Sequence, residues 1–158
     1  MYWILMLLYT VIVLLELGAN GWNSPIQTTL YGWKSLFNIT FLQDYVLIVL
    51  GGYIGTMFIL VAEILLSVLT RSALVAIFLP IVTLFIPSFV GNLHSVSGVL
   101  GLLPDQLLQM GVVVRLFNVY EIGDKIVTAI PILFILYTVL SVTIIPIIYA
   151  VYRKAEVY

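Results

Sequence analysis

Four long apolar runs dominate this chain and leave few residues for anything else. They cover roughly residues 2–17, 45–70, 72–90 and 126–152. An α-helix needs about 20 apolar residues to cross the hydrocarbon of a bilayer. The second and fourth runs exceed that length, the third meets it, and the first falls slightly short. The sequence therefore predicts an all-α, polytopic membrane protein with about four transmembrane helices.

Composition agrees with this prediction and excludes several classes of function. Hydrophobic residues make up 63% of the chain and charged residues 8%, whereas a soluble domain carries about 25% charged residues. The net charge of −1 gives no basic surface for a nucleic-acid partner. With no cysteine and one histidine, thiolate and histidine-rich metal sites are excluded. We expect a single transmembrane domain over residues 1–158 and no cofactor.

The first apolar run has two interpretations. Small residues follow it at 18–20 and would suit the cleavage site of a signal peptide. The residues before it, 1–3, carry no basic side chain, which a signal peptide needs. We therefore favour a retained helix.

Basic residues near the ends of the runs predict the orientation, because cytoplasmic loops are enriched in Lys and Arg. Arg71 lies in a tight turn, and Arg153 and Lys154 directly follow the last run. An equal number of basic residues on the other side is spread over two long loops, 18–44 and 91–125. Arg71, Arg153 and Lys154 are therefore expected to be cytoplasmic anchors of a cell-membrane protein with both termini in the cytoplasm.

The first outer loop contains a short amphipathic pattern. Ser24 and the proline after it are typical of a helix start. Apolar residues then recur on one helical face, at Ile26, Leu30, Trp33 and Phe37. This pattern predicts a helix lying in the membrane interface, which we interpret as a connector in preference to a gate for substrate entry.

The second outer loop, residues 91–125, is apolar but interrupted by glycine, serine and proline. A helix is expected from Pro104 to about Asn118. An apolar, broken segment of this length is typical of a re-entrant or interfacial element. Such an element can dip into the membrane only where other protein shields its backbone.

Three residues inside the spans are candidates for a pathway or an interface. Glu63 is the one ionisable residue well inside a span, where a carboxylate is costly unless paired, hydrated or protonated. It could face a substrate path or a protein interface, or it could serve packing as a neutral group. Pro80 and Pro87 are seven residues apart on one face. We favour a static kink there over a hinge or a cavity wall.

Gly51 and Gly55 form a GxxxG spacing in the second run. Small residues one turn apart let two helices approach closely. Packing inside the bundle is favoured over a dedicated dimer motif, although the same face is the expected contact surface if a second copy binds.

Several short strings occur in the order found in one family of transporters. They are residues 51–55 (GGYIG), 63–67 (EILLS), 70–72 (TRS), 86–88 (IPS) and 152–156 (YRKAE). Over residues 45–158 this arrangement resembles the last three membrane helices of type-2 ABC exporter permeases. That family places outer re-entrant helices before its last span, where residues 91–125 fall here.

The resemblance implies a membrane-spanning permease component of an ATP-driven export system, in a homodimer or a hetero-oligomer with another permease subunit. The chain carries no Walker motif, so a separate ATPase subunit is the expected partner, and the chain itself is not expected to be an enzyme. Members of the family have six spans and a long cytoplasmic coupling loop, which four runs do not provide. The alternative is a non-transporting small scaffold or regulatory subunit of a larger complex.

Overall fold

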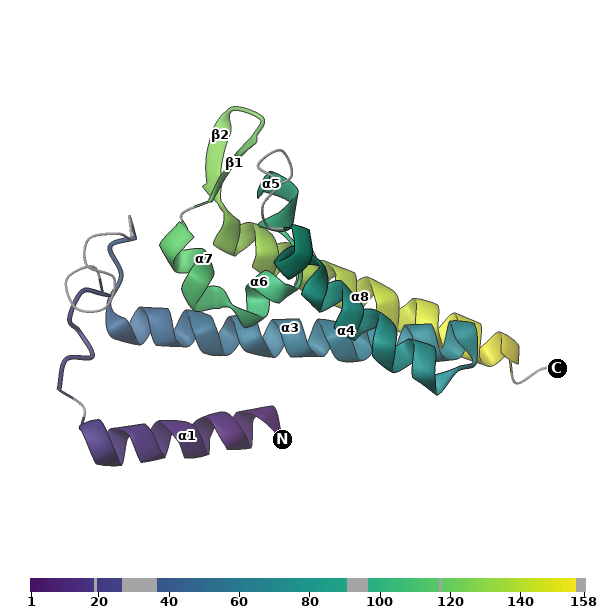
Figure 1. The fold of residues 1–158 in the computed structure, drawn as a ribbon, viewed down its shortest axis with the longest axis horizontal. Coiled ribbons are helices and arrows are strands. Elements are labelled where there is room, and N and C mark those ends of the chain that lie inside the picture. The colour runs from purple at the N-terminus through teal and green to yellow at the C-terminus, as the bar shows by residue number, and fades with distance from the viewer. Residues whose placement is uncertain (19, 27–36, 91–96, 117, 156–158) are drawn as a thin grey trace.

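The computed structural model describes residues 1–158 except 19, 27–36, 91–96, 117 and 156–158. It is mostly helical, with one small hairpin (Figure 1). The elements in chain order are α1 (Tyr2–Leu17), α3 (Phe41–Thr70), α4 (Ala73–Val90), α5 (Ser97–Leu100), α6 (Asp105–Leu108), α7 (Met110–Leu116), β1 (Val119–Ile122), β2 (Lys125–Thr128) and α8 (Ala129–Ala155).

The 30-residue helix α3 is the element on which most of the others pack. A capping box starts it. The Gln43 N–H donates to the Thr40 hydroxyl at 3.4 Å, and the Thr40 N–H donates to the Gln43 side chain at 3.0 Å. These bonds satisfy backbone groups that a helix start leaves without partners. The helix ends at Arg71, whose left-handed backbone (φ 51°, ψ 26°) redirects the chain into α4.

Helices α3, α4 and α8 form one bundle (Figure 1). α8 runs alongside α3 in the same direction, and the rings of Phe58 and Tyr137 meet edge to face with centroids 4.7 Å apart. α4 returns antiparallel to α3 after the turn at Arg71. The end of α3 that leads into this turn and the C-terminal end of α8 therefore lie at the same end of the bundle.

The segment between α4 and α8, which we call the outer segment (residues 97–128), folds against the N-terminal half of α3. Its helices α6 and α7 contact α3, and α7 also contacts α8. The core of the described residues lies here, built from Ile26, Leu107, Met110, Val113, Val114, Ala129, Ile130, Leu133 and Tyr137.

The helix expected from Pro104 to about Asn118 is broken in two. α6 ends at Leu108, and the backbone of Gln109 (φ −111°, ψ 40°) is not helical. Leu107 before the break and Met110 after it both lie in the core, each with no exposed surface. The break changes the direction of the chain between α6 and α7, and both helices contact α3.

A β-hairpin, absent from the all-α prediction, precedes α8. Its strands pair antiparallel from Val119 with Thr128 to Ile122 with Lys125. The two residues of the turn include Gly123 at φ +63°, a conformation that L side chains rarely adopt. The hairpin therefore uses part of the run that was expected to begin the last helix.

Helix α1 packs antiparallel to α3 but beside its N-terminal half only (Figure 1). The Tyr2 hydroxyl donates to the Val49 carbonyl at 2.8 Å, and the Trp3 and Tyr53 rings lie 4.9 Å apart. The N-terminus therefore lies beside the middle of α3 and does not reach the end near Arg71. The structure places the C-terminal end of α8 near Arg71, but not the N-terminus.

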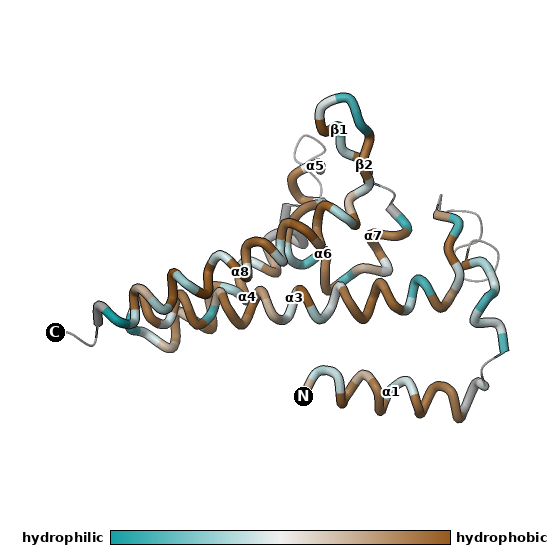
Figure 2. The backbone as a smooth tube through the Cα atoms, turned by 180° about the vertical axis from the view of Figure 1, so that it is seen from behind, coloured by the Kyte–Doolittle hydropathy of each residue, from teal (hydrophilic) through white to brown (hydrophobic). Residues whose placement is uncertain are grey.

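Two helices, α3 and α8, are long and apolar enough to cross a membrane by length and composition. α1 and α4 are also apolar, with shorter described stretches at Tyr2–Leu15 and Ala73–Phe85. Apolar residues run along all four helices in Figure 2. The amphipathic helix expected from Ser24 falls mostly on residues 27–36, outside those that the structure describes.

Candidate functional site

A cavity of about 140 Å³ lies where the outer segment meets the bundle. Its walls come from α3, from α4 and from Pro104, just before α6. The lining residues are Phe58, Ile59, Ala62, Leu66, Leu79, Pro80, Thr83, Leu84 and Pro104. The Thr83 hydroxyl donates to the Leu79 carbonyl within its own helix at 2.8 Å. The cavity therefore presents an almost wholly apolar wall.

The structure separates the three predicted pathway residues. Pro80 is buried in α4 and forms part of this cavity wall, the role that the sequence favoured less. Glu63 is half-buried on α3 and lines neither of the cavities described in this section. Pro87 lies within α4. A pathway or interface role for Glu63 stays a prediction.

Asp105, the first residue of α6, is a buried carboxyl that the sequence analysis did not single out. Only 5% of the residue is exposed. Its Oδ2 accepts a hydrogen bond from Gln106 Nε2 at 2.9 Å, while Oδ1 is buried with no hydrogen-bond partner. Burial raises the pKa of this carboxyl above its ordinary value, and the bonds from Gln106 only partly oppose the rise.

Two tyrosine hydroxyls hold the turn before α6 in place. Tyr137 of α8 donates to the Leu102 carbonyl at 2.7 Å. Tyr120 of the hairpin donates to the Gly98 carbonyl at 2.7 Å. We call residues 98–105, fixed at these two points, the tip of the outer segment. Hydropathy could not identify these contacts, because each joins residues more than 20 positions apart in the chain.

Gly51 and Gly55 are covered by the chain's own outer segment. A Cβ at Gly51 would lie 2.8 Å from Met110 Cε and 3.0 Å from the Leu107 carbonyl oxygen. A Cβ at Gly55 would lie 3.1 Å from both Leu107 Cβ and Leu108 Cδ2. The GxxxG face thus serves close packing inside the molecule and is not available to a second copy in this fold.

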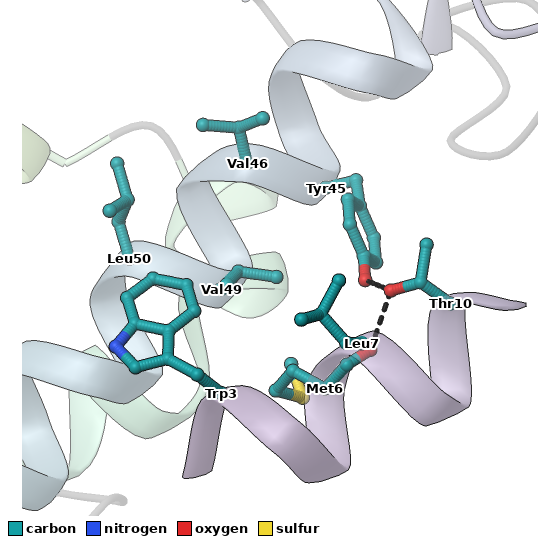
Figure 3. Close-up of a pocket in the computed structure, with 8 residues that line it drawn as sticks. All are labelled: Trp3, Met6, Leu7, Thr10, Tyr45, Val46, Val49 and Leu50. Carbon is teal, nitrogen blue, oxygen red and sulfur yellow. Dashed lines mark hydrogen bonds between the residues drawn. The ribbon is translucent and has the colours of Figure 1, made fainter.

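A second cavity, of about 230 Å³, separates α1 from α3 (Figure 3). It is lined by Trp3, Met6, Leu7, Thr10, Tyr45, Val46, Val49 and Leu50. The Thr10 and Tyr45 hydroxyls are hydrogen-bonded to each other, and Thr10 also donates to the Met6 carbonyl at 2.6 Å. The two polar groups satisfy one another, so the remaining wall is apolar.

The predicted cytoplasmic anchors lie at one end of the bundle. Arg71 is exposed at the end of α3, where its N–H donates to the Ser67 carbonyl at 3.0 Å. Arg153 is exposed near the end of α8, and Lys154 follows it within the same helix. The side of a membrane on which they lie stays a prediction.

Among the described residues, no group of three or more His, Cys, Asp or Glu side chains could hold a metal ion. No protein family, curated protein or solved structure matches this chain. The case for a function therefore rests on the geometry described above and on the sequence.

Proposed function

We propose that this chain is a membrane-embedded subunit of a transport assembly, with its outer segment entering the bilayer between crossing helices and returning to the same side. In this proposal α3, α4 and α8 cross the membrane, and α1 lies against the half of α3 nearer the outer face. Large apolar side chains are widely exposed on these helices. Contiguous exposed apolar surface of this kind is typical of a membrane or protein contact.

The depth of the tip carries the proposal. If the hydrocarbon begins near Thr70, about 30 Å of helix reaches back to about Gly51. Pro104 shares a cavity with Ala62 and Phe58, which lie about 12 and 18 Å along α3 from Thr70. Pro104, where the tip meets the bundle, is therefore near the middle of the hydrocarbon. Broken helices that meet at mid-membrane are a recurrent arrangement in transporters.

The energy source in this proposal is a separate chain. The resemblance to type-2 ABC exporter permeases favours ATP-driven export with a cytoplasmic ATPase subunit, reached through the end that carries Arg71 and Arg153. A homodimer or a second permease subunit would supply the other side of the path. Because Gly51 and Gly55 face the outer segment, that contact has to use another apolar face.

A specific observation favours the alternative of a non-transporting scaffold subunit. Both cavities have almost wholly apolar walls. A path for a polar solute needs several polar groups at membrane depth. If the chain transports, the cavities favour an apolar or amphipathic substrate.

Co-purification tests the proposal. The affinity-tagged chain is extracted from its native membrane in mild detergent, and proteins bound to it are identified and assayed for ATP hydrolysis. We expect an ATPase subunit to accompany the wild-type chain and to be lost with a Gly51→Leu variant, whose packing is disrupted. Recovery of other membrane proteins without an ATPase would contradict transport and favour the scaffold.

A further inference from the structure

The tip of the outer segment holds a carboxyl in surroundings that do not suit its charge. Asp105 is 5% exposed, and its buried Oδ1 has no hydrogen-bond partner. Its Oδ2 accepts a hydrogen bond from the Gln106 side chain, and the backbone N–H groups of Asp105 and Gln106 also favour the charged form. An ionised carboxylate removed from water needs a cation or donors to both oxygens. Here the donors are neutral, Oδ1 has none, and burial outweighs them.

Among the described residues, no basic side chain is close enough to Asp105 to offset its charge. α4 contains no ionisable residue. The ionisable residues of α3 are Asp44, Tyr45, Tyr53 and Glu63, and α7 carries Arg115. Tyr137 of α8 is close enough for its charge to interact with that of Asp105, and no charged side chain is among the groups that act on Asp105 itself.

We propose that Asp105 is a proton-binding site at the tip of the outer segment, occupied by a proton while α6 is docked against α3. The neutral carboxylic acid is the form that the buried position tolerates. When the O–H bond breaks, the proton passes to water, and the remaining carboxylate has to reach water as well. Proton release and docking of α6 therefore oppose each other.

This proposal goes beyond the proposed function and does not depend on an ATPase partner. Asp105 is buried by residues of this chain alone, so the proton site can be tested on the purified protein. Placement of the tip in hydrocarbon would strengthen the preference for the neutral form, because no water approaches from outside. Failure to find a partner would leave the proton site untouched.

Infrared spectroscopy detects the protonated carboxyl group directly. The full chain is labelled with ¹³C-aspartate, which marks only Asp44, Asp105 and Asp124. At neutral pH we expect a band from a protonated aspartic acid that disappears in Asp105→Asn. It should persist in Asp44→Asn and in Asp124→Asn, whose residue is exposed in the hairpin turn. A band that survives Asp105→Asn, or a carboxylate signal from Asp105, would overturn the proposal.

Stability against pH gives a second readout. The pKa of Asp105 in the folded protein lies above its unfolded value of about 3.9. The stability that the protonated carboxyl contributes is therefore complete below the unfolded pKa and is lost as pH rises through the folded pKa. The melting temperature of the wild type should fall relative to Asp105→Asn as pH rises, and Asp124→Asn should follow the wild type. Parallel curves for wild type and Asp105→Asn would contradict the proposal.

Docking is measured with a buried cysteine. The chain has no cysteine of its own, and Val113 in the core is 2% exposed, so Val113→Cys reports opening of the outer segment. The rate of maleimide labelling at this cysteine is divided by the rate for the same cysteine in Asp105→Asn at the same pH. We expect this ratio to rise several-fold from mildly acidic to alkaline pH. A constant ratio would break the link between proton release and docking.

Discussion

At the level of single residues, two glycines and two tyrosines determine where the outer segment sits. Gly51 and Gly55 let α6 and α7 approach the backbone of α3 more closely than any side chain would allow. Tyr137 and Tyr120 then hold the tip by its carbonyl groups. The glycines act by leaving space and the tyrosines by forming bonds, so substitutions at the two kinds of position should fail in different ways.

Gly51→Ala should destabilise the protein by about 1–3 kcal/mol through overpacking. The new methyl group would lie 3.0 Å from the Leu107 carbonyl oxygen, a backbone atom that cannot turn aside. Gly98→Ala is the control, because a Cβ there has nothing within 4 Å. Thermal unfolding in detergent, followed by circular dichroism, compares the two. Equal melting temperatures would show that α6 does not rest on Gly51.

Tyr137→Phe should cost about 1–3 kcal/mol, because it removes the donor to the Leu102 carbonyl within a partly buried contact. Tyr149→Phe, on the same helix with 69% of the residue exposed, should change stability little. The same unfolding assay measures both variants. If Tyr149→Phe loses as much stability as Tyr137→Phe, the hydrogen bond from Tyr137 to Leu102 does not stabilise the tip.

At the level of elements, the sequence predicted the long helices, joined α6 and α7 into one helix and missed the hairpin. The last predicted run, 126–152, becomes a helix only from Ala129, because residues up to Thr128 pair with β1. The helix expected from Pro104 breaks at Gln109 into α6 and α7, which both contact α3. Both features depend on partners far along the chain, which a local apolar pattern does not specify.

Helix α1 offers a test at this level, because few contacts attach it. A Cβ at Gly52 would lie 2.5 Å from the Tyr2 hydroxyl oxygen, so Gly52→Ala should push Tyr2 off the Val49 carbonyl and release α1. Cysteines replacing Met6 and Val46, which both line the cavity of Figure 3, can be joined by a short bifunctional maleimide.

We expect Gly52→Ala to reduce this crosslinking several-fold, and Gly98→Ala to leave it unchanged. Tyr2→Phe removes the hydrogen bond without adding bulk, so it should reduce crosslinking less. Undiminished crosslinking in Gly52→Ala would mean that α1 is held by other contacts.

For the whole molecule, the sequence predicted an apolar helical chain and an outer segment folded between its last helices. The candidate site was harder to predict. Glu63 stood out because it interrupts a span, while Asp105 lies at the start of a short predicted helix and was not singled out. The sequence did offer one indication, because Asp105 is an acidic residue within the segment that was expected to be re-entrant or interfacial. Its burial accompanies the packing of α6 against α3, a long-range contact that the local sequence does not specify.

The central claim is that the outer segment enters the membrane and returns to the same side. In this otherwise cysteine-free chain, single cysteines replace Val99 in α5, Asp124 in the hairpin turn, Ser72 in the turn after α3, and the core residue Val113. An impermeant maleimide is then added to intact cells. We predict that cysteines at 99 and 124 react from outside, that a cysteine at 72 reacts only after permeabilisation, and that a cysteine at 113 stays protected. Reaction of the cysteines at 99 and 124 from opposite sides would contradict the account, because the outer segment would then cross the membrane.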